Sequence, residues 1–568
     1  MNILLTAINA KYIHSNLAVY SLRAFAAKCG HKVQLAEYTI NHRMDFILEE
    51  IYKKKPDVLV FSCYIWNIEY VKELAEELHK LCPDLPIWAG GPEVSFETEQ
   101  FLSENPAFRG IMMGEGEQTF ARLCAHYEGR AVLEEIDGIS YRRTDGTIAV
   151  QPLKTLLPMD EIPFCYEDTG DFEHRIIYYE SSRGCPFNCS YCLSSVDKKL
   201  RFRSLPLVYR ELQFFIDHRV PQVKFVDRTF NCNHDHAWQI WNYIAAHDNG
   251  ITNFHFEISA DLLGDREMEL MEMMRPGLIQ LEIGVQSTHP ETIREIHRTM
   301  RLPQVKAAVR RVQGGKNIHQ HLDLIAGLPF EDYPTFRNSF DEIYALRPEQ
   351  LQLGFLKVLK GSYMYEHAAE YGILYHTRPP YEVLRTRWLS YDEILRIKLV
   401  EEMLEIHYNS GQFLTFLSCL EPCISSPFEM FLAMGDFYQE KDLLAMNHSR
   451  VRRSEILLEF AVTVDAEREM YYREALVLDL DKREKSKSRP KWATDLAPYK
   501  KKTAEMLRER GLEKSYCHLE PFSYLYKERV SDGPVWVLFD YEHRDARMNE
   551  ANMTVIAALP EEAERENG

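Results

Sequence analysis

The sequence predicts an α/β protein in three parts: a doubly wound N-terminal domain, a central partial barrel of six strand–helix units and a C-terminal α+β region. Three observations predict this class. Short apolar runs alternate with amphipathic stretches in the first 130 residues, a proline-bounded linker follows at 158–163, and the alternation resumes with a longer repeat from about 174 to 360. Such alternation is typical of parallel sheets covered by helices.

The composition is ordinary for a soluble globular protein, with 45% hydrophobic and 27% charged residues among 568. It excludes a disordered or collagen-like chain. With 67 basic and 86 acidic residues the net charge is −19, which disfavours nucleic acid as a partner because phosphate binding needs a positive field. No apolar run reaches the roughly 18 residues of a membrane span, and the start is no signal peptide. We expect a cytoplasmic protein without a membrane partner.

In the first domain, residues 1–135, five apolar segments predict parallel strands. They cover residues 2–8, 33–38, 57–63, 86–90 and 110–113. The stretches between them predict helices; in residues 69–81, for example, Val71, Leu74 and Leu78 fall at helical spacing. A five-stranded sheet with helices on both faces follows from this order.

Residues 136–173 predict a hairpin and a linker, because strand candidates at 139–142 and 147–150 flank an Asp145-Gly146 turn. Residues 174–365 predict the partial barrel, in which chemistry sits at the carboxyl ends of the strands. The predicted barrel strands cover residues 176–182, 222–227, 254–258, 279–285, 320–326 and 351–357.

The C-terminal region, residues 366–568, is predicted to be helical or α+β. Residues 391–407 and 413–420 indicate helices, and 535–539 and 553–558 indicate buried strands. Two more segments, 452–462 and 474–479, have the apolar content of strands or short helices. The basic run 482–491 lacks an apolar face, and a solvated charged loop is favoured over an RNA-contacting patch.

Three of the twelve cysteines stand together, and this cluster carries the chemistry. Cys185, Cys189 and Cys192 have C-x3-C-x2-C spacing and directly follow the first predicted barrel strand. Three thiolates on one tight loop can hold a single iron–sulfur cluster and leave one iron free for a ligand. The alternative is a zinc loop without its fourth ligand. With no secretion signal, the remaining cysteines indicate buried thiols in a reducing compartment.

This cysteine pattern, preceded by Ser182-Arg183-Gly184 and with an aromatic residue before the last cysteine, resembles the radical S-adenosylmethionine (radical SAM) superfamily. The resemblance implies that the cysteines hold a 4Fe-4S cluster whose free iron binds S-adenosylmethionine. It also implies that one electron cleaves this cofactor to give a 5′-deoxyadenosyl radical, which abstracts hydrogen from an unreactive carbon. An electron donor such as flavodoxin or ferredoxin is then an implied partner.

Later strand ends resemble the S-adenosylmethionine-contacting segments of the same superfamily. Segment 225–231 resembles the segment that contacts the methionine amino group. Segment 284–287 resembles the segment that contacts the ribose and the carboxylate, and segment 323–329 resembles the strand end beside the adenosyl group. Arg298 can pair with a carboxylate, and Gln286 and Asp323 can hold ribose hydroxyls. The residues implied to bind S-adenosylmethionine are Tyr191, Asp227, Glu257, Ser259, Gln286, Arg298 and Asp323.

The first domain resembles the Rossmann-like, cobalamin-binding (B12-binding) domain that precedes many radical SAM barrels. The segments that carry the resemblance follow predicted strands, where an open α/β sheet binds its ligand. The implied cobalamin-binding residues are Asn16, Ser62, Tyr64, Gly90, Gly91, Glu93, Gly114 and Glu115. No D-x-H-x-x-G motif occurs in residues 1–135, so cobalamin is expected without a protein histidine ligand, and His14 is interpreted as a loop residue. The alternative is a degenerate domain that only supports the barrel.

The whole order of domains resembles cobalamin-binding radical SAM proteins of the DUF4080-containing type. That resemblance implies methylation of an unactivated carbon or phosphorus centre in a small-molecule or still unknown substrate. A non-methylating radical rearrangement, ring closure or ring contraction is the alternative. Methylthiolation of tRNA is disfavoured, because the first domain lacks three further clustered cysteines. A cobalamin-binding sensor or scaffold without turnover remains the alternative of another class.

Overall fold

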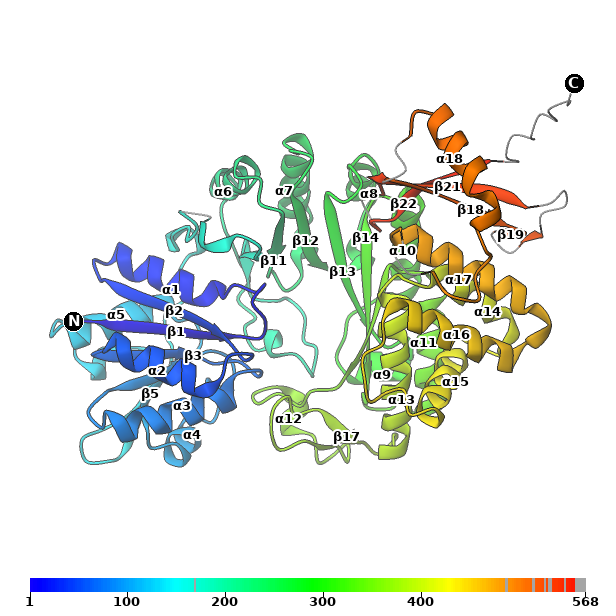
Figure 1. Ribbon diagram of the computed structural model, residues 1–568. Coiled ribbons are helices and arrows are strands. Elements are labelled where there is room, and N and C mark those ends of the chain that lie inside the picture. The colour runs from blue at the N-terminus through cyan, green and yellow to red at the C-terminus, as the bar shows by residue number, and fades with distance from the viewer. Residues whose placement is uncertain are drawn as a thin grey trace, which may run out of the picture.

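A computed structural model describes residues 1–167, 170–485, 489–512, 516–525, 528–529, 534–545 and 548–556. Figure 1 shows the three predicted parts in chain order, with the N-terminal domain in blue, the barrel in green and the C-terminal region in yellow to red. The fold is α/β, as predicted. No helix among the described residues has both the length and the apolar content that a membrane span requires.

The N-terminal sheet contains the five predicted parallel strands in the order β2-β1-β3-β4-β5. Its strands are β1 Ile3–Asn9, β2 Val33–Thr39, β3 Val58–Ser62, β4 Ile87–Gly90 and β5 Phe108–Met112. Its helices are α1 Leu17–Lys28, α2 Met44–Lys54, α3 Ile68–Leu81, α4 Thr98–Glu104 and α5 Glu117–Tyr127. Alternate residues of β1 serve two cores, with Leu5 packed in the core that contains α1 and Leu4 in the core that contains α3. Burial on both faces explains the continuous apolar strands.

The predicted hairpin extends this sheet to seven strands. Its strands β6 Ile139–Arg142 and β7 Ile148–Gln151 pair antiparallel beside β5. Ile139 and Tyr141 are buried. A five-stranded sheet would leave the backbone groups of β5 unpaired, so the hairpin belongs to this sheet and is more than a connection.

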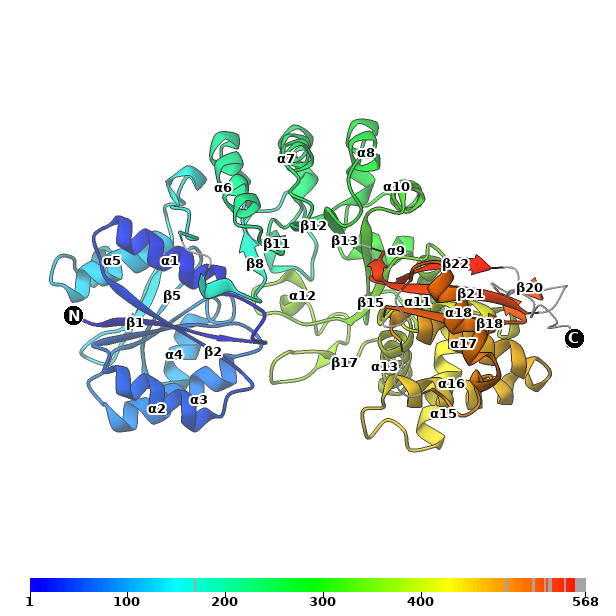
Figure 2. The same ribbon diagram turned by 45° about the horizontal axis from the view of Figure 1, so that its top comes forward.

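The central sheet contains six parallel strands in the order β8-β11-β12-β13-β14-β15. They are β8 Ile177–Tyr179, β11 Gln222–Phe225, β12 Asn253–Ile258, β13 Ile279–Gln286, β14 His319–Ala326 and β15 Gln350–Phe355. Figure 2 shows the helices outside the strands; they are α6 Leu205–Asp217, α7 His234–Ala246, α8 Asp265–Glu272, α9 Pro290–Glu295, α10 Leu302–Gly315 and α11 Tyr333–Tyr344. Burial alternates along β13: its apolar side chains pack in the main core, and its polar ones face the barrel interior, where Glu282 meets Lys224 of β11.

The segment after β15, residues 356–385, reaches back to the N-terminal domain; we call it the bridge segment. It contains α12 Tyr363–Glu366, β16 Leu374–Tyr375 and β17 Val383–Arg385, and both ribbon views place α12 and β17 between the N-terminal domain and the barrel. Tyr365 donates a hydrogen bond to Glu97 at 2.9 Å, and Tyr381 donates one to Glu93. The bridge segment therefore attaches the β15 end of the barrel to the N-terminal domain.

The C-terminal region packs helices against the barrel, and its three-stranded sheet packs against α17. Its helices are α13 Tyr391–Leu404, α14 Leu414–Leu420, α15 Pro427–Glu440, α16 Arg450–Val464, α17 Glu469–Arg483 and α18 Lys500–Glu509, and its sheet contains β18 Cys517–Phe522, β21 Val535–Arg544 and β22 Ala551–Ile556. Segments 452–462 and 474–479 are both helical. Strand β22 is mostly exposed, so the expectation of a buried strand at 553–558 is wrong for 553–556, and 557–558 lie outside the described residues. Of the basic run, 486–488 also lie outside them.

Candidate functional site

Two cavities meet where the N-terminal domain faces the barrel. The larger, about 730 Å³, lies between the strand ends of the N-terminal sheet and the first barrel strands, a size at the upper end of small-molecule sites. The smaller, about 180 Å³, lies at the barrel mouth around the cysteine loop. Arg228 and Glu257 line both, so the two cavities share a wall.

All three clustered cysteines line the smaller cavity, and all three are free thiols. Backbone hydrogen bonds shape their loop, including Cys192 N to Cys189 O at 3.1 Å and Ser190 N to Ile296 O at 2.9 Å. Burial raises the pKa of the Cys189 thiol, and Arg298 opposes that shift. Among the described residues lining this cavity there is no fourth cysteine and no histidine. A closed zinc site needs four ligands, so the donor set fits an iron–sulfur cluster with one open iron.

Six of the seven residues predicted to bind S-adenosylmethionine line the same cavity. They are Tyr191, Glu257, Ser259, Gln286, Arg298 and Asp323. Arg298 donates hydrogen bonds to Tyr191 Oη at 3.2 Å and to the Gly284 carbonyl, yet its Nε is buried without a partner, as is Gln286 Oε1. Buried polar atoms are almost always hydrogen-bonded, so these two atoms fit a polar ligand in the cavity.

The backbone aims Gln286 into this cavity. Its φ is +72°, a left-handed conformation that costs a residue with a side chain about 1–3 kcal/mol, and the pairing of β13 with β14 shifts register between Gly284 and Gln286. A Cβ on Gly284 would lie 2.4 Å from Gln286 Nε2. Glycine at 284 therefore makes room for the turned glutamine.

Charged side chains fill the barrel interior beneath the cavity. Burial, and next the charge of Glu282, raise the pKa of Glu257 to about 7. Burial likewise raises the pKa of Asp323, although His321 lies 2.8 Å away. For Glu282 burial acts in the same direction, but His255 and then Lys224 more than offset it and hold its pKa well below the usual range.

Asp227 lies outside both cavities in this structure. Its buried carboxylate accepts hydrogen bonds from Ser181 N at 2.9 Å and from the Ser181 and Ser182 hydroxyls at 2.6 Å. This arrangement ties the end of β11 to the chain that leads into the cysteine loop.

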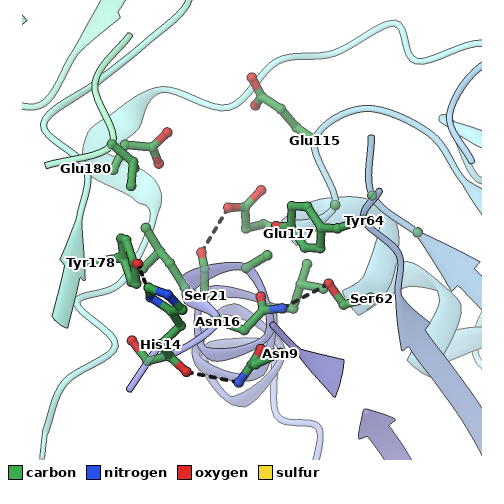
Figure 3. Close-up of a pocket in the computed structure, with 18 of the residues that line it drawn as sticks. Asn9, His14, Asn16, Ser21, Ser62, Tyr64, Glu115, Glu117, Tyr178 and Glu180 are labelled. Atoms are coloured by element: carbon green, nitrogen blue, oxygen red, sulfur yellow. Dashed lines mark hydrogen bonds between the residues drawn. The ribbon is translucent and has the colours of Figure 1, made fainter. Parts of the chain in front are cut away.

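The larger cavity is lined by seven of the eight residues predicted to bind cobalamin. They are Asn16, Ser62, Tyr64, Gly90, Gly91, Gly114 and Glu115. Asn16 donates to Ser62 Oγ at 3.3 Å (Figure 3). A Cβ on Gly91, whose φ is +113°, would lie 2.4 Å from Cys63 O, so only glycine builds this wall. Glu93 is not part of the lining and contacts Tyr381 of the bridge segment instead.

His14 also lines the larger cavity, and its Nδ1 lies 2.7 Å from Tyr178 Oη (Figure 3). Burial, followed by the charge of Lys11, lowers its pKa. The lining further includes residues that were not predicted as cobalamin ligands: Ser21, Glu117, Tyr178, Glu180, Arg183, Lys224 and Arg228. Lys224 was the one of these that the sequence could have indicated. A charged residue inside a predicted barrel strand is expected to face the barrel interior.

Comparison with known proteins defines the class. A model of the radical SAM superfamily matches residues 179–343, a B12 binding domain model matches 3–124, and the family described as "Protein of unknown function (DUF4080)" matches 369–552. The chain is a radical SAM protein. More closely, it belongs to the radical SAM proteins that carry an N-terminal B12-binding domain and a C-terminal DUF4080 region.

Curated relatives support this assignment. The chain is 24% identical over 311 residues to 2-(S-pantetheinyl)-carbapenam-3-carboxylate methyltransferase of Streptantibioticus cattleyicolor, covering 51% of this chain and 45% of the relative. It is 25% identical over 368 residues to an uncharacterized methyltransferase of Pyrococcus horikoshii, covering 62% and 76%. The chain thus spans about half the length of the first of these relatives.

Solved structures show the same fold. The cobalamin-dependent radical enzyme OxsB with aqua-cobalamin bound has a TM-score of 0.60 at 16% identity, covering 84% of this chain and 79% of that one. TsrM of Kitasatospora setae, with cobalamin and an iron–sulfur cluster bound, has a TM-score of 0.54 at 17% identity, covering 68% and 79%. The cofactors of this protein are a 4Fe-4S cluster, S-adenosylmethionine and cobalamin, and the two cavities fit them.

Proposed function

We propose that this protein is a cobalamin-dependent radical SAM enzyme that methylates an unactivated carbon or phosphorus centre of a small polar molecule. The shared wall of the two cavities carries the proposal, because a molecule held against Arg228 and Glu257 reaches both cofactor sites at once. When bound, S-adenosylmethionine and the cluster supply a hydrogen-abstracting radical, and cobalamin supplies a methyl group.

The residues of the smaller cavity have separate roles in this proposal. Cys185, Cys189 and Cys192 hold the cluster. Arg298 pairs with the cofactor carboxylate through its unpartnered Nε, and Gln286 Oε1 accepts from a ribose hydroxyl. Asp323, Ser259 and Tyr191 complete the polar lining.

In the larger cavity, the glycine-rich segments at 90–91 and 114–116 support the corrin, and Ser62 bonds the displaced nucleotide base. We infer that no protein histidine ligates cobalt, since the first domain lacks the D-x-H-x-x-G motif. His14 Nδ1 is engaged by Tyr178.

The substrate position is polar. Arg228 and Glu257 form no ion pair with each other or with another described residue, whereas Lys224 is paired with Glu282 at 2.9 Å. Buried or confined charges need partners, so a substrate with an anionic group for Arg228 and a hydrogen-bond donor for Glu257 suits this wall. The carbapenam relative is named for a substrate that bears a carboxylate, which is consistent with this proposal.

The proposal is tested with anaerobic, cofactor-loaded full-length protein, a reduced electron donor such as flavodoxin, and S-adenosylmethionine carrying a CD₃ group. We expect 5′-deoxyadenosine and transfer of CD₃ to the substrate in a cell extract fraction of small metabolites. Cys189→Ala should lose the cluster absorbance and both products, because two thiolates cannot hold the cluster.

The alternatives give different products. 5′-Deoxyadenosine without CD₃ transfer indicates a non-methylating rearrangement. Absence of both products from fully loaded protein indicates a binding role and contradicts the proposal. Twelve cysteines of the described residues are free thiols, which suits a reducing compartment, and we propose a cytoplasmic location.

A further inference from the structure

A buried group of ion pairs joins the N-terminal domain to the cysteine loop, and we call it the interdomain clamp. It consists of Glu115 and Glu117 from the N-terminal domain and Glu180, Arg183 and Arg201 from the barrel. Arg183 contacts Glu117 at 2.5 and 3.1 Å, Glu180 at 2.8 Å and Glu115 at 3.4 Å. Arg201 binds Glu115 through both nitrogens of its fork, one of them at 3.1 Å.

The clamp lies beside the larger cavity. Glu115, Glu117, Glu180 and Arg183 are part of the cavity lining, and Figure 3 shows Glu117 bonded to Ser21 of α1. The Glu117 side chain is 5% exposed and that of Arg201 is 12% exposed. Charges this far from water interact strongly with their partners and are poorly screened by salt.

The clamp also holds both ends of the cysteine loop. Arg183 stands two residues before Cys185, and Arg201 belongs to β10 Arg201–Phe202, which pairs antiparallel with β9 Ser182–Arg183. Residue 201 lies directly opposite residue 183 in this pairing. Both arginines reach the same N-terminal segment, 115–117. A ligand that fixes this segment therefore also fixes the two ends of the loop that carries the cluster.

We propose that the interdomain clamp couples cobalamin binding to cluster binding and positions the two cofactors relative to each other. The proposal rests on the proposed function only for the identity of the two ligands. Thermodynamic linkage makes the coupling reciprocal: if the cluster tightens cobalamin by some factor, cobalamin tightens the cluster by the same factor. Arg201 lines neither cavity and is therefore a positioning residue.

The test measures the affinity of full-length protein for hydroxocobalamin by absorbance titration, once with the cluster reconstituted and once without it. In the unaltered protein we expect the cluster to tighten cobalamin binding about tenfold, within the usual range of coupling between sites. Arg201→Gln should bind both cofactors with a ratio near one. Arg201→Lys keeps the charge but loses the fork geometry, and its ratio should lie between the two.

Matched controls separate coupling from general damage. Arg311 forms exposed ion pairs with Asp265 and Glu272 elsewhere on the barrel, so Arg311→Gln should keep the full ratio. Circular dichroism of Arg201→Gln and of the milder Arg201→Lys detects unfolding independently of coupling.

A ratio near one in the unaltered protein overturns the clamp proposal, and so does an unchanged ratio in both Arg201 variants. These titrations need no turnover. Intact coupling without methyl transfer would therefore reject the proposed function and leave the clamp standing, whereas methyl transfer without coupling would do the reverse.

Discussion

Glu331 is a fully buried carboxyl group with no ion-pair partner among the described residues, and this predicts a defined dependence of stability on pH. It is 0% exposed and accepts hydrogen bonds from Ser287 at 2.6 Å and Ser339 at 2.9 Å, while its Oε2 has no partner. Burial raises its pKa to about 7 from the ordinary value of 4.5, although the two serines act in the opposite direction.

The sign follows from linkage. Since the pKa is higher in the folded than in the unfolded state, folding favours the protonated carboxyl. The resulting stability is present below pH 4.5 and is lost as the pH rises through 7. Each pH unit in this interval corresponds to about 1.4 kcal/mol, so the free energy of unfolding should fall by about 3 kcal/mol across it from this group alone.

Glu331→Gln removes the charge at nearly constant shape. Relative to the unaltered protein, the variant should be more stable above pH 8 by up to about 3 kcal/mol. Below pH 5 it should be less stable, because the new amide donors lack an acceptor. Denaturant unfolding of the full chain from pH 5 to 9 measures this difference, and Glu291→Gln at an exposed position is the control. A difference between Glu331→Gln and the unaltered protein that does not change with pH would refute the reasoning.

Three further outcomes are expected. Gly91→Ala places a Cβ 2.4 Å from Cys63 O at a φ of +113°. With a strain of about 1–3 kcal/mol it should weaken cobalamin binding about 5- to 150-fold, and an unchanged titration would contradict this. Glu211→Gln breaks the buried pair with Arg203, joined at 2.5 and 2.8 Å, and should lower the free energy of unfolding by about 3–5 kcal/mol; denaturant unfolding with a loss below about 1 kcal/mol would speak against it. Burial lowers the pKa of His518, but the carboxylates of Asp481 and Glu520 more than offset this and raise it to about 9. The stability that its charge contributes is present below pH 6.5 and should disappear as the pH rises through 9. Thermal unfolding of His518→Gln should lack that loss.

The sequence predicted strands such as β1 and β3 well because they are buried on both faces and read as apolar runs. Two helices of the C-terminal region could not be told from strands for the same reason. In α17 every residue from Glu474 to Asp481 is buried, so burial follows no helical spacing there. Only packing on several sides at once produces this pattern in a helix, and a single sequence does not reveal it.

For the functional site as well, some features could be predicted from the sequence and others could not. The cysteines were predictable because their spacing is local. The partner of Glu93, Tyr381, lies 288 residues away in the sequence, and the pairing of Arg183 with Glu117 joins segments 66 residues apart. No local pattern contains such contacts. Asp227 stands within a recognisable motif, yet its carboxylate is satisfied by Ser181 and Ser182, so the motif predicted its neighbourhood better than its contacts.

The two edges of the central sheet explain why the barrel comes with both flanking parts. An open six-stranded sheet has two edges whose backbone groups lack partners. On the β15 side, the Asn409 side chain of the C-terminal region accepts a hydrogen bond from Leu351 N and donates one to Leu351 O, both at 2.9 Å. On the β8 side, Ile176 N donates to Ile13 O at 2.8 Å, and residue 14 forms a parallel bridge with residue 176. The loop that covers the β8 edge also places His14 in the larger cavity. The same loop therefore protects the sheet edge and forms part of the cavity proposed for cobalamin.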